Sequence, residues 1–234
     1  MASVKLYQDD RLSALDVIHG VSTKPAGDMS RTENRDKLMA AAAIPAKAAV
    51  FEQVHGDRIV ELDSREKYLE LLKQPLLDAD AWLLSAPGIA AAVYAADCAP
   101  VFVWDKTASV IGLAHCGWRG TAQQLPLKLA KAVARHPKAQ APFSAFIGPY
   151  IRPCCYSVNE ETASHFRKTS VENRGGKLYL DNGLEIKSQL MEAGLEPDAI
   201  NVTKACTRCL NGEFFSFRRN KSQERLLAFV FKKV

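Results

Sequence analysis

The sequence lacks the features that mark membrane and exported proteins. Charged residues break its longest apolar runs well short of the roughly 18 residues that a membrane-spanning helix needs. Residues 1–10 contain no apolar segment like that of a signal peptide. We therefore expect a cytoplasmic protein with no membrane partner.

Blocks of basic residues are also missing. The net charge is +5, but no cluster of lysine and arginine singles out a nucleic-acid-binding surface. A modest positive charge fits small anionic ligands equally well, so we expect a small-molecule partner and no nucleic acid. No internal repeat and no linker divides the 234 residues, and the 47% hydrophobic content is ample for a core. We therefore expect a single catalytic domain covering residues 1–234.

Cysteine is present, but not in a disulfide pattern. Six cysteines in a reducing compartment favour free thiols. Cys154 and Cys155, together with Cys206 and Cys209, would supply enough thiolates for a zinc site. Adjacent cysteines are poor chelators of one tetrahedral ion, however, and only Cys206-x-x-Cys209 has the usual spacing. The pattern by itself argues against a four-thiolate site.

The most informative stretch lies in the middle of the chain. A run of small apolar residues at 90–96 is typical of a strand buried on both faces. Two β-rich runs follow at 101–104 and 109–114, and the four residues between them predict a hairpin turn. Cys98 and His115 would then lie at strand ends, where a sheet holds polar side chains rigidly at the mouth of a cleft.

Strand-like and helix-like patterns alternate along the rest of the chain. The expected strands cover residues 15–22, 48–51, 58–62, 145–147, 214–218 and 226–231. The expected helices cover residues 32–43, 65–73, 121–135, 159–168 and 184–193. Because proline is tolerated only in a first helical turn, Pro126 indicates that the third of these helices begins near residue 125.

Three residues stand out for their chemistry. His55 lies between two predicted strands beside a glycine, and Cys98 and His115 end strands of their own. If the three converge, two imidazole nitrogens and one thiolate suit Zn²⁺ or copper, with a fourth position open for water. Alternatively, Cys98 is a thiolate nucleophile with His115 as its base and no metal. Spacing alone leaves open a third interpretation, in which the three residues are unconnected.

Basic residues lie near two predicted helix starts. Gly117 and Gly120 permit a tight strand-to-helix loop whose free N–H groups favour an oxyanion or a phosphate, and Arg119 adds positive charge. Arg35 lies in the first turn of the helix expected at 32–43, where a surface role or a phosphate or carboxylate site is open.

Other polar residues have simpler structural interpretations. His19 is expected to be a core or turn histidine. Asp78 and Asp80 have the spacing at which two carboxylates share one face of a strand, and capping or hydrogen bonding inside the fold explains them.

Seven short motifs follow one another along the chain: QVHG at 53–56, DAD at 78–80, ADCAPV at 96–101, HCGWRGT at 115–121, IGP at 147–149, CCY at 154–156 and FFSFRR at 214–219. In this order they resemble the family described as multicopper polyphenol oxidases or laccase-domain proteins. That family includes bacterial YfiH- and YlmD-like proteins, some called peptidoglycan editing factor, and a mammalian purine nucleoside enzyme. The resemblance covers roughly residues 15–231, and the segment from ADC to HxGWRG is its most specific part.

The resemblance implies a mixed α/β (α+β) fold of the YfiH-like type, a β-sheet sandwich flanked by helices. His55, Cys98 and His115 match the residues that the family uses for metal binding and catalysis. The metal it implies is Zn²⁺, with Cu²⁺ as the alternative. The oligomeric state would be a monomer or a homodimer.

The activities implied are phosphorolysis of adenosine, inosine and methylthioadenosine, and deamination of adenosine. The partners would then be a nucleoside and phosphate. Arg119 is the first candidate for binding phosphate, with Lys24 and Arg35 behind it. Lys24 stands where members of the family usually have arginine.

Three rival functions remain to be weighed. True laccases use many His-x-His pairs, whereas this chain has five histidines and no such pair, so laccase chemistry is excluded. A second enzymatic interpretation is a Cys98/His115 amide hydrolase that edits peptidoglycan precursors by removing a mis-incorporated amino acid from UDP-MurNAc. The third is a metal-binding protein without turnover, which the complete set of three ligands argues against.

Overall fold

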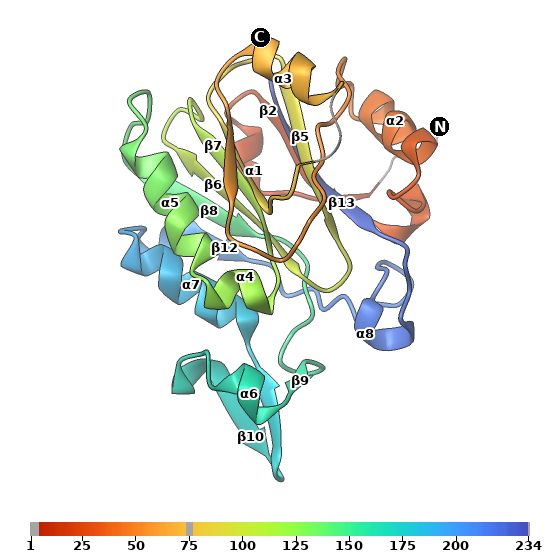
Figure 1. The fold of residues 1–234 in the computed structure, drawn as a ribbon, viewed down its shortest axis with the longest axis vertical. Helices are drawn as coiled ribbons and strands as arrows, with labels where there is room; N and C mark the ends of the chain where they lie inside the picture. Colours follow the sequence, from red (N-terminus) through yellow and green to blue (C-terminus); the bar gives the residue numbers. More distant parts are fainter. Residues whose placement is uncertain (1–4, 74–76, 234) are drawn as a thin grey trace.

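Two β-sheets lie face to face in the computed structural model, which describes residues 5–73 and 77–233, and helices cover their outer faces (Figure 1). The expected sandwich flanked by helices is therefore confirmed. Within the described residues, no helix combines the length and hydropathy needed to cross a membrane.

The smaller main sheet has four strands, and all neighbours in it are antiparallel. Their order is β1 (Leu6–Tyr7), β2 (Val17–Ser22), β13 (Leu226–Lys232) and β5 (Ile89–Ala95). The sequence LLAFVFK explains the position of β13, because a strand that is apolar on both faces is stable only between two partners and two packed layers.

The larger sheet has six strands and mixed directions. Their order is β12 (Ile200–Val202), β8 (Phe143–Ile147), β6 (Ala99–Asp105), β7 (Ile111–Cys116), β4 (Ala81–Leu84) and β3 (Ile59–Leu62). The predicted hairpin is β6–β7, and its turn is held by the carboxylate of Asp105, which accepts hydrogen bonds from the backbone of Thr107 and Val110.

Side chains alternate between the two faces of the larger sheet. On β4, Trp82 and Leu84 pack into the core between the sheets, whereas Ala81 and Leu83 pack against helices. Those helices are α5 (Leu125–Arg135) and α7 (Asn182–Glu192). The outer face of the smaller sheet is covered by α2 (Thr32–Ala41).

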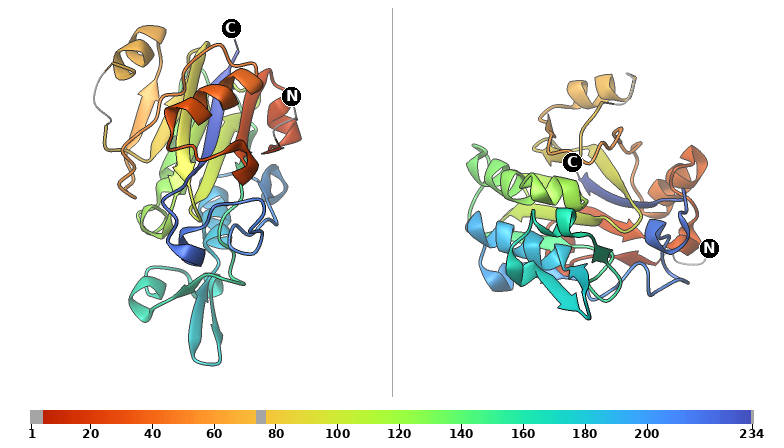
Figure 2. Two further views of the ribbon diagram at one scale, coloured as in Figure 1. Left: turned by 90° about the vertical axis from the view of Figure 1, so that its right-hand side faces the viewer. Right: turned by 60° about the horizontal axis from the view of Figure 1, so that its bottom comes forward.

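The remaining elements are short. The helices are α1 (Asp10–Ser13), α3 (Arg65–Leu71), α4 (Trp118–Ala122), α6 (Glu160–Ala163) and α8 (Phe217–Asn220). A small third sheet consists of β10 (Val171–Arg174), β11 (Lys177–Leu180) and β9 (Ser157–Val158). Together with α6 it projects from one end of the molecule (Figure 2).

Three expected elements are missing or much shorter in the structure. The strand expected at 214–218 is a loop that enters α8, because the Ser216 side chain caps that helix by accepting the N–H of Arg219. Only Glu160–Ala163 of the helix expected at 159–168 is helical, and the strand expected at 48–51 is reduced to one bridge between Ala49 and Ala91.

The helix expected at 121–135 is interrupted, as its proline indicated. It forms α4 and α5, separated at Gln124, whose backbone is left-handed (φ 63°). Pro126 lies in the first turn of α5. α4 therefore stays a separate short helix, which begins at Trp118 just after the end of β7.

His19 on β2 is fully buried, and its Nε2 accepts a hydrogen bond from the backbone N–H of Asp9 at 2.9 Å. Burial lowers its pKa from 6.5 to about 4. The imidazole of His19 binds a proton more tightly in the unfolded chain than in the folded protein. The stability that neutral His19 contributes is therefore complete above the unfolded pKa of 6.5. The free energy of unfolding falls by about 3 kcal/mol as the pH decreases from the unfolded pKa to the folded pKa.

The variant His19→Gln keeps a hydrogen-bond acceptor but has no titrating group. We expect its free energy of unfolding to fall less between neutral and mildly acidic pH than that of the unaltered protein. Urea unfolding on both sides of the window between the two pKa values measures this difference. Equal acid sensitivity of the two proteins would contradict it.

Candidate functional site

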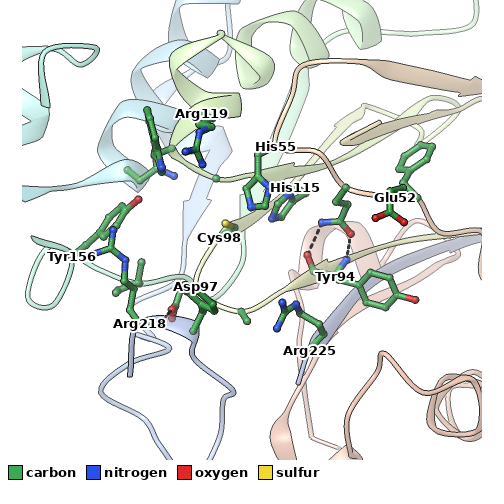
Figure 3. A pocket seen from close by; sticks show the side chains of 18 residues that line it. Glu52, His55, Tyr94, Asp97, Cys98, His115, Arg119, Tyr156, Arg218 and Arg225 are labelled. Atoms are coloured by element: carbon green, nitrogen blue, oxygen red, sulfur yellow. Dashed lines mark hydrogen bonds between the residues drawn. The ribbon is translucent and has the colours of Figure 1, made fainter. Parts of the chain in front are cut away.

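His55, Cys98 and His115 come from three separate segments and meet at one point. His55 lies in the loop before β3, Cys98 between β5 and β6, and His115 on β7. One potential ligand atom of each lies within 4.8 Å of those of the others. Figure 3 shows the Cys98 sulfur and both imidazoles pointing into the same space. We call these three residues the His-Cys-His group.

Asp80 sets the orientation of both histidines. It is fully buried, and its carboxylate accepts the backbone N–H groups of His55 (3.1 Å) and Gly56 (2.7 Å). It also bonds Nδ1 of His115 at 2.8 Å, which leaves Nε2 of that ring free for a ligand or a proton. The backbone bonds help hold His55 in a left-handed conformation (φ 60°). The spacing of Asp78 and Asp80 did not reveal this role, and β4 begins only after them.

Cys98 and His115 shift each other's pKa values in opposite directions. Burial opposes ionisation of the thiol, but the charge of His115 and hydrogen bonds from both histidines outweigh it and lower the pKa of Cys98 to about 6. Burial likewise disfavours the charged form of His115, but Cys98 and Asp80 raise its pKa to about 9. The pair is therefore a thiolate and an imidazolium near neutral pH.

The His-Cys-His group opens into a cavity of about 550 Å³. Its other polar side chains include Glu52, Gln53, Asn182, Arg119, Arg218 and Arg225, and its apolar wall includes Phe51, Tyr94, Trp118, Ile151, Tyr156 and Phe217. Figure 3 shows Arg119 and Arg218 on one side of the group, and Arg225 on the other side. Such a volume and lining suit a small anionic ligand with an aromatic or apolar part.

Of the three basic residues expected to bind phosphate, only Arg119 is among the described residues that line the cavity. Its guanidinium lies over the Trp118 ring, 4.5 Å from the centroid. Lys24 instead lies over the ring of Phe215, and Arg35 donates to the backbone carbonyls of Met29 and Ser30. The structure therefore places these two residues apart from the His-Cys-His group.

Sequence reasoning missed Asp97 and Arg218. Asp97 has a left-handed backbone (φ 94°), and its buried carboxylate accepts the hydroxyl of Thr207 (2.6 Å) and the backbone N–H of Arg218 (2.7 Å). The guanidinium of Arg218 then lies over the Tyr156 ring at the cavity. The signal was available, since Asp97 and Arg218 belong to the ADCAPV and FFSFRR motifs.

The donor set of the His-Cys-His group fits a metal ion. Two imidazole nitrogens and one thiolate are ligands that zinc and copper both accept. Asp80 supplies the outer hydrogen bond that metal-binding histidines commonly make. The cavity leaves the remaining coordination position accessible, which is the arrangement of a catalytic rather than a structural site.

Gly117 is required by close packing at this site. A Cβ atom there would lie 2.9 Å from Sγ of Cys98 and 3.1 Å from Cδ2 of His55. The backbone (φ −72°, ψ 172°) is one that alanine adopts freely, so Gly117→Ala should perturb the His-Cys-His group without straining the chain. We expect about a tenfold loss of turnover or metal affinity at nearly unchanged melting temperature.

Gly212→Ala is the matched control for that prediction, because a Cβ at Gly212 would meet no atom within 4 Å. Enzyme kinetics, metal titration and thermal melts of the two variants make the comparison. Equal behaviour of both variants would show that the His-Cys-His group tolerates displacement.

Comparisons with known proteins agree with this fold. The model of the family described as multi-copper polyphenol oxidoreductase laccase matches residues 25–233. "Purine nucleoside phosphorylase YlmD" of Geobacillus stearothermophilus is 32% identical over 210 residues, covering 84% of this chain and 77% of that protein. "Adenosine deaminase RL5" of an unknown prokaryotic organism is 29% identical over 177 residues, 71% of this chain and 68% of the relative.

Among solved structures, the hypothetical protein YfiH of Bacillus licheniformis superposes with a TM-score of 0.86 at 24% identity. The match covers 99% of this chain and 97% of the other. The YfiH-like fold is therefore shared over nearly the whole length.

Proposed function

The chain belongs to the multi-copper polyphenol oxidoreductase laccase family, and from this premise we propose that it is a purine nucleoside enzyme. The proposed reactions are phosphorolysis of adenosine, inosine and methylthioadenosine, and deamination of adenosine. The observation that carries the proposal is the His-Cys-His group at the base of a cavity that also contains arginine and aromatic side chains. The names of the relatives support the same classes of reaction.

In phosphorolysis, a phosphate oxygen attacks C1′ of the ribose as the bond from C1′ to the purine nitrogen breaks. The cavity can hold both reactants, because aromatic side chains such as Trp118 and Tyr156 offer flat surfaces to the base. Arg119 brings a guanidinium that matches phosphate geometry. His115, which Asp80 fixes in place, can deliver a proton from Nε2 to the departing purine when this nitrogen holds no metal.

In deamination, the oxygen of water adds to C6 of adenine and ammonia leaves. His115 and Cys98 form an acid–base pair that can accept the proton of the attacking water and return it to the leaving nitrogen. Zinc, with copper as the alternative, would be held by His55, Cys98 and His115. It would take the place of the acid–base pair, because Nε2 of His115 and the thiolate would then be ligands, and it would supply a Lewis acid that lowers the pKa of bound water.

Product analysis with adenosine tests the proposal. Protein of known metal content is incubated with adenosine in the presence and absence of phosphate, and the products are separated by chromatography. We expect adenine and ribose 1-phosphate only with phosphate, and inosine without it. The proposal would be refuted if metal-loaded protein released no purine base from adenosine, inosine or methylthioadenosine and formed no inosine from adenosine.

Arg119→Gln should separate the two activities. Loss of the guanidinium should raise the KM for phosphate about tenfold, whereas deamination of adenosine, which uses no phosphate, should change little. Arg35→Gln is compared with it, because Arg35 donates to carbonyls of its own loop but its guanidinium also lies over the ring of Tyr94 in the cavity wall. Arg65→Gln serves as the control, because Arg65 is exposed on α3 and does not line the cavity. If Arg35→Gln raises the KM and Arg119→Gln does not, the phosphate site has been assigned to the wrong arginine.

A second function has one specific observation in its favour. The lowered pKa of Cys98 makes it a thiolate beside His115, which is the arrangement of a cysteine hydrolase. We propose amide hydrolysis of a nucleotide-linked muramyl amino acid as this alternative. Release of the amino acid by metal-free protein that is inactive on nucleosides would favour it. Turnover that requires a metal would argue against a purely thiolate mechanism.

A further inference from the structure

A second group of ligands lies apart from the cavity. Cys154 and Cys155 come from the loop between β8 and β9, and Cys206 and Cys209 from the loop between β12 and α8. All four sulfurs lie within 4.8 Å of one another. We call these residues the four-cysteine cluster. Its members are not among the residues that line the cavity, so the proposed function does not use them.

The spacing of the sulfurs matches a tetrahedral thiolate site. Zinc–sulfur bonds of about 2.3 Å place two sulfurs of a tetrahedron about 3.8 Å apart. Sγ of Cys209 lies 3.7 Å from that of Cys154 and 3.3 Å from that of Cys155. Little movement would be needed to enclose an ion.

A tight turn at residues 152–156 allows two adjacent cysteines to act as ligands of one ion. The carbonyl of Arg152 accepts the N–H groups of both Cys155 (2.9 Å) and Tyr156 (3.0 Å), so the chain bends tightly at this point. The bend lets the two neighbouring side chains approach Sγ of Cys209 together. Sequence spacing could not show this turn.

A hydrogen bond links the two loops at the buried member of the cluster. Sγ of Cys206 accepts the backbone N–H of Arg152 at 3.5 Å. This contact fixes the loop that carries Cys154 and Cys155 against the loop that carries Cys206 and Cys209.

Basic side chains surround the cluster. Arg152 and Arg208 donate to the carbonyls of Thr203 and Cys155, and Arg174 donates to the carbonyl of Pro153. Four thiolates and one divalent ion carry a net charge of −2, and these guanidinium groups bring compensating charge to the loops that hold them.

We propose that Cys154, Cys155, Cys206 and Cys209 bind a zinc ion in a structural four-thiolate site, distinct from the His-Cys-His group. Four protein ligands leave no position for water, so this site has no catalytic role of its own. It joins the loop that ends at Tyr156 to the loop that leads into α8, and Tyr156 and Arg218 of α8 both line the cavity. The ion would therefore hold one wall of the cavity in place.

Metal analysis in a background without the first site tests the proposal. The variant Cys98→Ala/His115→Ala removes two ligands of the His-Cys-His group. After purification under reducing conditions with zinc and removal of free metal, we expect about one zinc ion per chain. Adding Cys206→Ser/Cys209→Ser should abolish binding, and adding Cys116→Ala, which removes a cysteine of neither group, should leave it unchanged. Zinc-free background protein, or zinc retained by the serine variant, would overturn the proposal.

A spectroscopic measurement covers the case in which the serine variant does not fold. Zinc is first removed from the folded background protein with a chelator under reducing conditions. Cobalt added to this protein should then give the intense sulfur-to-metal charge-transfer and visible bands of a tetrahedral thiolate site. Added zinc should displace the cobalt and remove these bands. Absence of the bands would refute a metal site. A disulfide within the cluster, detected by mass spectrometry in a fresh extract prepared under conditions that preserve the thiol state of the cell, would also refute it.

Discussion

Cys98→Ala should reduce the turnover of adenosine by at least about a thousandfold, with and without phosphate. The thiolate is one of the three potential metal ligands and also the charge that raises the pKa of His115. Alanine removes both contributions and leaves the fold intact, because Cys98 lies in the loop between β5 and β6 and its side chain lines the cavity rather than the core. Steady-state kinetics and metal analysis of the same preparation measure the effect.

Cys116→Ala is the appropriate control. Cys116 is a neighbour of His115 in sequence, but it is buried on β7 in the core beneath α5, and burial raises the pKa of its thiol. It should therefore remain a neutral thiol with no part in the reaction, and its loss should change kcat by no more than a few-fold. Comparable losses in the two variants would mean that Cys98 acts only through folding.

Asp80→Asn should reduce turnover and metal affinity about a hundredfold. Burial opposes the charge of this carboxylate, but its bonds to His115 and Gly56 lower its pKa, so Asp80 is ionised. The carboxylate now bonds to three donors, which are the backbone N–H groups of His55 and Gly56 and Nδ1 of His115. Asparagine has only one acceptor oxygen, so its NH₂ group would face at least one of these donors. His115 would lose its fixed tautomer, and His55 its left-handed backbone support.

Asp78→Asn is the matched substitution for this test. It neutralises a carboxylate two residues away whose side chain does not line the cavity. Isothermal titration with zinc and kinetics with adenosine should show the loss in Asp80→Asn alone. If metal affinity survives in Asp80→Asn while turnover falls, Asp80 acts in proton transfer more than in ligand orientation.

Half of the candidate site could be predicted from local patterns. The apolar runs and the turn at Asp105 specify the β6–β7 hairpin, and its register pairs Ala99 with Cys116 and Pro100 with His115. Cys98 and His115 are therefore brought together by the hairpin that the sequence predicts. His55 could not be placed in this way, because its position depends on a buried carboxylate from another segment.

The differences between the sequence patterns and the structure have identifiable physical causes. The alternating aromatics of FFSFRR are typical of a strand, but side-chain caps at Asp97 and Ser216 direct the backbone into α8. Spacing along the chain does not show that the four sulfurs lie together, because they meet through a turn and a contact between loops. Arg35 lies at a helix start as expected, and it donates to carbonyls of its own loop. Contacts distant in sequence decide the first two outcomes, and a local contact decides the third.

The central place of β13 has a consequence for synthesis on the ribosome. β2 and β5 are not neighbours, and each pairs with β13, which is made more than a hundred residues after β5. Until residues 226–232 have emerged, the smaller sheet cannot close, and the edges of β2 and β5 that pair with β13 have no partner. Ser216 and Arg218, which bind the carboxylate beside Cys98, are also translated late. Nascent chains should therefore depend on chaperones, and the cavity becomes complete only when translation of these last elements has finished.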